Sequence, residues 1–347
     1  MRFLVIGDPH FKTNEMVQSI RMAEAIVQIA AEAKPDFIVC LGDTLDRHET
    51  IHVEPLTQAI KWLSQLKDIA PVFLLIGNHD RPNNSDFLSD KHPFSGLDQW
   101  KNLIVVDKVI TRSYGEFNFF FVPYVPPGRF QEALETNPDW SLKKKWTAGF
   151  SHQEFYGIEV AKGIFSDKGD RWPVDGPLLI NGHIHDRSIP QANIISIGTP
   201  RQHDFDESFD KAISLFTFTA DAYKEVRIPL PLPRKLIVRL TTQEFYTYEL
   251  PSPLVDYIKI EISGTRAELV TIRKLDKIKQ FRKAGVKIVT RDTEAGLERI
   301  REKPLPDKVW QETPFKLRLY HRIKGDQELE RVYSRIFQKK RITIKRK

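Results

Sequence analysis

Short apolar runs and helix-like repeats alternate along the first part of the chain. Three runs at 3–6, 37–41 and 72–76 contain almost no polar residue, a pattern typical of strands in a sheet that is covered on both faces. Further strand-like runs occupy 118–122, 146–150 and 178–180. Between the first three runs, apolar residues recur with the spacing of a helical face: Met16, Ile20, Ala23, Val27 and Ala30, and then Leu56, Ile60 and Leu63. The pattern predicts an α/β fold with a sheet covered on both faces.

A proline-rich segment separates this region from a smaller one. The sequence RIPLPLPRK at 227–235 has three prolines in nine residues, which is typical of a linker. Beyond it, the residue pattern predicts a strand at 257–262, a helix at 275–283 and a strand at 286–290. We therefore expect a large domain at 1–226, the linker at 227–235, a small α/β domain at 236–310 and a basic C-terminal segment at 311–347.

Charge is distributed unevenly between these regions. Residues 231–347 carry 29 Lys and Arg against 15 Asp and Glu, a net charge of +14, whereas residues 1–230 carry 24 against 31, a net charge of −7. The chain ends in the basic sequence QKKRITIKRK, which follows an amphipathic stretch at 328–337. This asymmetry favours a polyanionic partner for the basic part, although Lys and Arg also cover ordinary soluble surfaces.

Composition narrows the class of protein. A chain of 347 residues with 41% hydrophobic and 29% charged residues is long enough for one large core and a second domain. Its single cysteine, Cys40, excludes an intramolecular disulfide and favours a reducing compartment. No apolar run approaches the ~20 residues of a membrane span, and the run at 3–6 is too short for a signal peptide. We expect no membrane partner and an intracellular location, in the cytoplasm, nucleus or nucleoid.

Polar residues follow closely after five of the predicted strands. The motifs, in chain order, are DPH, GDTLDR, GNHD, a Ser-His pair in FSHQEF, and GHIH. Because the carboxyl ends of parallel strands line one crevice of an α/β sheet, we expect these side chains to converge there. Glycine precedes the polar group at Gly7, Gly42, Gly77 and Gly182, which allows sharp turns and close approach of bulky groups.

Converging carboxylate, amide and imidazole groups are suited to binding a pair of divalent ions. Carboxylate oxygens neutralise charge, imidazoles add directional nitrogen ligands, and one carboxylate can bridge two ions. Because no cysteine belongs to the set, the site suits manganese, iron or zinc with open positions better than a closed structural zinc site.

These five motifs, in this order, resemble those of the calcineurin-like metallophosphoesterases. The resemblance implies a sandwich of two sheets flanked by helices, with a smaller C-terminal α/β capping domain, and two divalent ions that activate water for attack on phosphorus. Mn²⁺ is the expected metal. By position in the motifs, one ion would be held by Asp8, His10, Asp43 and His185, and the other by Asp43, Asn78, His152 and His183. His79 would face the scissile phosphate, and Asp80 would orient it.

Within this superfamily the chain looks most like the SbcD-type nuclease subunits of double-strand-break repair complexes, and especially like their bacteriophage recombination-nuclease relatives. The segments HQEFYGIEVAKG and NGHIHDRSIPQANIISIGTP carry this similarity, which covers about residues 1–220. It implies a metal-dependent DNA exo/endonuclease that acts on double-stranded ends and single strands, forms a homodimer and docks on the coiled coil of an SMC-like ATPase. A bacteriophage-type relative would be a viral protein inside its host cell.

Some residues depart from this pattern or lie outside its metal ligands. Many cellular members carry His where this chain has Asp46, with His48 nearby. Arg47, His48 and His203 are candidate substrate contacts. The stretch at 328–337 is the candidate ATPase-docking helix, but an amphipathic helix serves its own domain just as often.

Two other functions remain open. The same metal set could belong to a phosphatase or phosphodiesterase of small molecules or phosphoproteins, which would leave the basic region unexplained. A non-catalytic scaffold would have no need of a full ligand set. Cleavage of duplex DNA, compared with hydrolysis of a chromogenic phosphodiester, separates the first two functions.

Overall fold

The computed structural model of the chain describes residues 1–220, 222–293, 323, 325, 326, 329 and 333. They divide into two compact units. The first comprises Met1–Val238, Leu250–Lys259 and Gly285–Lys287, and the second comprises Arg239–Glu249, Ile260–Ala284 and the residues from Ile288 onward. The predicted segments at 311–347 and 328–337 lie almost entirely outside the described residues.

The first sheet of the first unit has six strands in the order β14-β13-β1-β2-β3-β4. Their bounds are β1 Arg2–Ile6, β2 Phe37–Cys40, β3 Val72–Leu75, β4 Leu103–Val106, β13 Ile213–Phe218 and β14 Tyr223–Ile228. Strands β1 to β4 are parallel, and β13 is antiparallel to β1. Every residue of β2 and β3 is buried, as expected for central strands covered on both faces.

The second sheet also has six strands, in the order β11-β12-β10-β7-β6-β5. Their bounds are β5 Ile110–Tyr114, β6 Phe117–Val122, β7 Ala148–Ser151, β10 Leu179–Asn181, β11 Ser188–Gln191 and β12 Ile194–Ser196. The inner strands β6, β7, β10 and β12 are parallel to one another. A separate hairpin, β8 (Glu159–Ala161) and β9 (Ile164–Phe165), follows β7.

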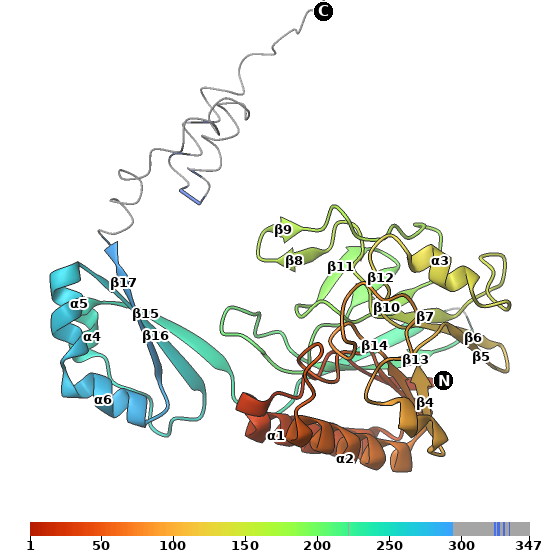
Figure 1. Cartoon of the computed structure of the whole chain (residues 1–347), viewed down its shortest axis with the longest axis horizontal. Coiled ribbons are helices and arrows are strands. Elements are labelled where there is room, and N and C mark those ends of the chain that lie inside the picture. Colours follow the sequence, from red (N-terminus) through yellow and green to blue (C-terminus); the bar gives the residue numbers. More distant parts are fainter. Residues whose placement is uncertain (221, 294–322, 324, 327–328, 330–332, 334–347) are drawn as a thin grey trace, which may run out of the picture. The chain divides into compact units, whose positions relative to one another are not determined.

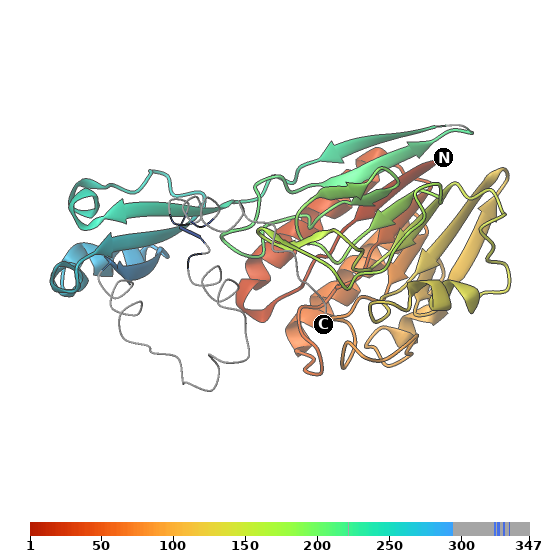
Figure 2. The same ribbon diagram turned by 90° about the horizontal axis from the view of Figure 1, so that it is seen from above.

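The two sheets pack face to face, and helices cover their outer faces. Helices α1 (Met16–Ala33) and α2 (Val53–Ile69) lie side by side against the first sheet (Figures 1 and 2), where Met22 and Trp62 pack into its apolar face. Helix α3 (Phe130–Glu135) packs with Trp146 on the outer face of the second sheet. The predicted fold class, a two-sheet sandwich flanked by helices, is confirmed.

Phenylalanine side chains fill much of the space between the two sheets. The rings of Phe73 and Phe121, one from each sheet, stack with centroids 4.2 Å apart and planes 9° apart. Phe3 meets Phe119 edge-on at 4.6 Å. Aromatic pairs of this kind stabilise a core by about 0.5–1.5 kcal/mol beyond the burial of their area, so this seam holds the sheets in a defined relative position.

A three-stranded sheet and three helices follow the first unit's sandwich in the chain. The strand order is β15-β16-β17, and the bounds are β15 Lys235–Thr241, α4 Thr242–Thr247, β16 Tyr257–Gly264, α5 Arg266–Arg273, α6 Asp276–Lys283 and β17 Lys287–Asp292. Helices α4 and α5 each begin with a capping box, in which a threonine and a glutamate exchange hydrogen bonds. The predicted linker at 227–235 overlaps the end of β14 and the first residue of β15, so residues 229–234 connect the two strands.

The structure corrects the expectation that the motif residues follow strands of one sheet. The strands that carry the motifs do not share one sheet, because β1, β2 and β3 belong to the first sheet whereas β7 and β10 belong to the second. Apolar runs covered on both faces look alike in either sheet, so the pattern alone does not separate them.

Two short 3₁₀ helices, η1 (Thr13–Glu15) and η2 (Ser95–Gln99), complete the described elements. Within the described residues, no helix has the length and apolar character needed to cross a bilayer.

Candidate active site

The motif residues of both sheets meet at one end of the sandwich. Five of the candidate ligands are buried, with exposed fractions from 0% to 4%: Asp8, His10, Asp43, Asn78 and His152. His183 and His185 are partly buried. Two groups have ligand atoms that lie within 4.8 Å of one another, Asp8 with His10 and His185, and Asp43 with His152 and His183. The sequence therefore predicted side chains that the fold brings together.

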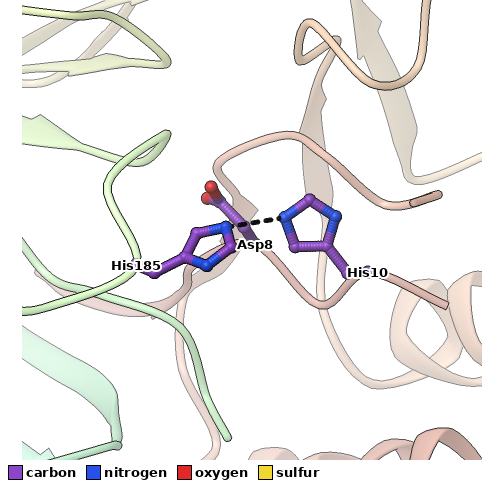
Figure 3. A group of neighbouring side chains, drawn as sticks. All are labelled: Asp8, His10 and His185. Carbon is purple, nitrogen blue, oxygen red and sulfur yellow. Dashed lines mark hydrogen bonds between the residues drawn. The ribbon is translucent and has the colours of Figure 1, made fainter. Parts of the chain in front are cut away.

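In the first group, two imidazole nitrogens face each other. Nε2 of His10 lies 3.2 Å from Nε2 of His185, with the Asp8 carboxylate beside them (Figure 3). Among the described residues, Oδ2 of Asp8 and Nδ1 of His10 are buried without a hydrogen-bond partner. Buried polar atoms normally have partners, and a cation between the facing nitrogens and the carboxylate would supply one for Oδ2 of Asp8; Nδ1 of His10 faces Asp46 instead, at 3.7 Å. The donor set fits a divalent metal.

The second group also directs several donor atoms at one point. Oδ1 of Asn78 lies 3.0 Å from Nε2 of His152 and 2.9 Å from Nδ1 of His183. Nδ1 of His152 donates to the carbonyl of Leu41 at 2.8 Å, which leaves Nε2 directed toward Asn78. Fixing one ring nitrogen in this way is how metal-binding histidines are oriented.

Asp43 lies between the two groups. Its Oδ1 accepts a 2.8 Å hydrogen bond from the backbone N–H of His79. Its Oδ2 lies 3.8 Å from Nε2 of His10 and 3.3 Å from Nε2 of His152. One oxygen is therefore held by the backbone, while the other faces a histidine of each group, as a bridging carboxylate requires.

Burial and charge shift the titration of these groups in opposite directions. Burial would raise the pKa of Asp43, but the nearby histidines, His152 first, hold it well below its usual range. Burial would lower the pKa of His152, but Asp43 and Asp8 raise it to about 9. Burial raises the pKa of Asp8 to about 6 and lowers the pKa of His183 to about 3. Without a cation, a proton on His152 balances Asp43, and metal binding would displace it.

Three of the candidate ligands have an unusual backbone conformation. His10, Asp43 and His183 have φ values of 42°, 47° and 70°, in the left-handed region that non-glycine residues seldom adopt. Each such residue costs about 1–3 kcal/mol unless its surroundings impose the conformation. Strained residues of this kind cluster at functional sites, which agrees with the position of this one.

Glycine allows the motif loops to pack closely. A Cβ on Gly77 would lie 2.2 Å from both the backbone nitrogen and Oδ1 of Asp43. Gly42 has φ +114°, and a Cβ there would lie 2.6 Å from Nδ1 of His152. At these two positions glycine is needed because a side chain would clash with a candidate ligand, as the sequence pattern led us to expect.

The His79 ring lies beside the ring of His10, with centroids 5.1 Å apart. A different residue orients it from the one predicted. Its Nδ1 donates to the backbone carbonyl of Asp46 at 2.7 Å, so Nε2 is the ring atom left for a substrate. The His48 ring stacks on the His79 ring with centroids 4.4 Å apart. The side chain of Asp46 pairs with Lys12 at 3.0 Å and lies 3.7 Å from Nδ1 of His10.

Asp80 does not hydrogen-bond the His79 ring, which corrects the sequence-based expectation. Its carboxylate instead accepts from the backbone N–H groups of Thr44, Leu45 and Gly77 at 2.9–3.2 Å. Burial and the charge of Asp43 raise its pKa to about 6. Asp80 therefore joins the loop after β2 to the loop after β3, which places Asp43 and His79 relative to each other.

The remaining predicted site residues occupy different environments. His203 is only 2% exposed, and its Nε2 lies 3.2 Å from the carbonyl oxygen of Asp8. It supports the backbone of a candidate ligand and is not placed to touch a substrate. Arg47 is exposed and lines a cavity of about 240 Å³ next to Asp46.

Sequence reasoning missed Glu207, which contacts His185. Oε1 of Glu207 lies 2.8 Å from Nδ1 of His185, and Oε2 accepts from the backbone N–H of His203. Nζ of Lys211 lies 3.0 Å from Oε2 of Glu207. Burial would raise the pKa of Glu207, but His185 and Lys211 lower it to about 2. Glu207 lies in an acidic loop, HDFDESFD, with no regular spacing that would single it out.

Comparison with known proteins places this chain in a family. Residues 1–187 match the family described as "Calcineurin-like phosphoesterase". The chain is 37% identical over 284 residues to "Putative phosphoesterase 078R" of Invertebrate iridescent virus 3, covering 81% of this chain and 82% of that protein. It is 36% identical over 281 residues to "Putative phosphoesterase 244L" of Invertebrate iridescent virus 6, covering 79% of this chain and 97% of that protein.

One solved structure has a weaker likeness. GAP50, the anchor in the inner membrane complex of Plasmodium, aligns with 68% of this chain and 90% of its own at 13% identity and a TM-score of 0.39. A score this low bears on neither fold nor function.

Proposed function

This chain belongs to the calcineurin-like phosphoesterases, a family of metal-dependent hydrolases, and from that premise we propose that it is a DNA exo/endonuclease. The observation that carries the proposal is the charge distribution. Residues 1–230, which contain every candidate ligand, have a net charge of −7, whereas residues 231–347 have a net charge of +14. A negative catalytic region gains little affinity for a polyanion, so the basic region would bind the phosphate backbone.

The basic residues include several that are free to meet solvent. Lys274, Arg282 and Lys283 are exposed on or next to α6, and none of them has a carboxylate partner within the described part of the chain. Contacts between such basic side chains and backbone phosphates position a nucleic acid without reading its sequence. We therefore expect little sequence preference and strong salt dependence.

Two divalent ions, Mn²⁺ by proposal, would be held by the two groups of ligands with Asp43 between them. Bound there, they would supply an activated water and stabilise charge on the phosphate oxygens. His79 would contribute through Nε2, the ring atom not committed to Asp46: in its doubly protonated form it would donate the Nε2 proton to the leaving alkoxide and become the neutral ring, which keeps its hydrogen on Nδ1. His48, stacked on the same ring, would limit its rotation.

The proposal extends to partners and location. We propose that the protein forms a homodimer and that an SMC-like ATPase docks on its C-terminal segment. We also propose that it acts inside a host cell as a viral protein, since both relatives named above are viral. Light scattering on the purified protein measures its oligomeric state. Co-purification with an SMC-like ATPase from the same genome tests the docking of the ATPase.

One experiment separates the nuclease from the other phosphoesterases. End-labelled linear duplex DNA is incubated with the protein and Mn²⁺ or Mg²⁺, alongside a chromogenic phosphodiester and a phosphomonoester. We expect DNA products with Mn²⁺ that disappear in the His79→Ala variant. Hydrolysis of the chromogenic esters without any DNA cleavage would overturn the nuclease proposal and support a phosphatase or small-molecule phosphodiesterase.

A matched pair of variants tests the basic region directly. Replacing Arg282 and Lys283 with alanine removes two exposed charges, and we expect the slope of log K against log salt for DNA binding to fall by roughly 1.8 if both contact phosphate. Replacing the exposed Lys101 and Lys143 of the first unit is the control, with no change expected. Equal slopes in all three proteins would contradict a role for this part of the basic region.

A further inference from the structure

A cavity of about 240 Å³ lies beside the metal ligands, between the loop that follows β1 and the loop that follows β2. Its walls combine apolar and polar groups. Phe11, Leu45 and Pro55 are buried and supply apolar surface, whereas Asn14, Thr50 and Arg47 are exposed and supply polar groups. Pockets for drug-sized ligands span roughly 300–1,000 Å³, so this cavity suits one small organic group.

The cavity adjoins the proposed reaction centre through Asp46. This residue lines the cavity, its carbonyl oxygen orients His79, and its carboxylate lies 3.7 Å from Nδ1 of His10. A substrate whose phosphate sits at His79 therefore has its neighbouring group within reach of the cavity. Asp46 separates the two spaces and contacts both.

The charges of the cavity favour a group that carries phosphate on one side. Lys12 and Arg47 both line it. Lys12 is paired with Asp46 at 3.0 Å, whereas Arg47 has no carboxylate partner among the residues that the structure describes. An apolar floor with amide and hydroxyl groups at its edge suits the flat face and the polar rim of a nucleobase. The unpaired guanidinium suits the adjacent phosphate of a strand.

We propose that this cavity is a nucleoside subsite, which holds one unpaired nucleoside next to the scissile phosphate. The inference rests on the proposed nuclease function and adds to it the part of the substrate that the protein grips beside the metal centre. The cavity is too small for a base pair, so the nucleoside that enters it has left the duplex.

Cavity filling tests the proposal. Asn14→Trp places a large side chain at the mouth of the cavity from an exposed position in η1. Val17→Trp is the matched control, because Val17 is 63% exposed in α1 and does not line the cavity. The substrates are the p-nitrophenyl esters of thymidine 5′-phosphate and thymidine 3′-phosphate, compared with methyl p-nitrophenyl phosphate, which has no nucleoside.

The measured quantity is the ratio of kcat/KM for a thymidyl ester to kcat/KM for the methyl ester. We expect wild type to favour one thymidyl ester by about tenfold or more, the range typical of a group bound in a pocket. Asn14→Trp should lose that preference and Val17→Trp should keep it. An unchanged ratio in Asn14→Trp would overturn the subsite.

A binding measurement keeps the test independent of turnover. Calorimetry with thymidine 5′-monophosphate and thymidine 3′-monophosphate should show at least one binding wild type and Val17→Trp alike, and Asn14→Trp about tenfold more weakly. Equal binding to all three proteins would reject the subsite. Failure of the nuclease proposal has a different signature, because wild type would then hydrolyse small esters and leave DNA intact.

Discussion

Glu207 holds His185 through a 2.8 Å contact between its Oε1 and Nδ1 of the imidazole. A carboxylate only accepts hydrogen bonds, so Nδ1 carries the hydrogen, and Nε2 faces His10 in the first group of candidate ligands. The backbone of His203 and the ammonium of Lys211 hold the carboxylate itself in place. Glu207 therefore orients a ligand without contacting the ion.

Replacing Glu207 with glutamine should weaken metal binding at the His185 group. Loss of a carboxylate partner to a metal-binding histidine typically reduces metal affinity by roughly 10- to 100-fold. Calorimetric titration with Mn²⁺ measures the effect without turnover. Asp206→Asn is the control, because Asp206 is an exposed neighbour and should bind metal as wild type does. Equal affinities in the two variants would show that Glu207 does not position His185.

Replacing Asp43 should abolish metal binding, whereas replacing His79 should abolish turnover and leave metal binding intact. Asp43 faces both groups of ligands, so Asp43→Ala should lose both ions, as measured by the metal content of the purified protein. His79→Ala should keep both ions and lose turnover by roughly 10²- to 10⁴-fold, the usual contribution of a general acid. Two ions still bound in Asp43→Ala would contradict the bridge, and wild-type rates in His79→Ala would remove His79 from the reaction.

A single methyl group on Gly77 should disturb the metal site. Its Cβ would lie 2.2 Å from two atoms of Asp43, so the loop after β2 must move. We expect Gly77→Ala to lower the free energy of unfolding by about 1–3 kcal/mol and to weaken metal binding. Gly96→Ala is the control, because a Cβ there meets no atom within 4 Å. Unaltered metal affinity in Gly77→Ala would mean that Asp43 does not depend on this close approach.

Glu15 should make stability depend on pH in the acidic range. It pairs with Lys235 and, at 2.6 Å, with Arg201. Burial would raise the pKa of Glu15, but these two cations hold it below its usual value of 4.5. The folded state therefore gains stability that is fully present above pH 4.5 and is lost as the pH falls through the lowered pKa.

The Glu15→Gln variant measures this contribution. It leaves Lys235 and Arg201 buried without their carboxylate, and the free energy of unfolding at neutral pH should fall by about 3 kcal/mol. The difference from wild type in urea unfolding should shrink as the pH is lowered below 4.5. Glu24→Gln, at an exposed position of α1, should show no difference at any pH. A pH-independent difference for Glu15→Gln would exclude the ion pairs as its cause.

The sequence was informative where residue type and order carry the signal. The seven ligand candidates could be predicted because each Asp, Asn or His follows an apolar run that ends at the same edge of the fold. The orienting contact to His79 could not be predicted, because it comes from the backbone of Asp46, and every residue has a carbonyl. Asp80 looked like its partner only because it is adjacent in sequence.

Other features depend on long-range geometry that no local pattern records. Glu207 is one of several acidic residues in its loop, and only the fold selects it. Left-handed backbone at His10, Asp43 and His183 is uncommon for any residue except glycine, although Asp and His tolerate it better than most, so the residue types alone do not predict it. The division of the strands between two sheets depends on pairings between distant segments.

The phenylalanine seam has a consequence for chemistry some distance away. Asp8, Asp43 and Asn78 follow strands of one sheet, whereas His152, His183 and His185 follow strands of the other. Each group of ligands therefore draws on both sheets, so sliding one sheet past the other would change the distances among the ligand atoms of each group. The stacked rings of Phe73 and Phe121 thus fix the position of one sheet against the other. Replacing them with smaller side chains should reduce catalytic activity although no ligand is changed.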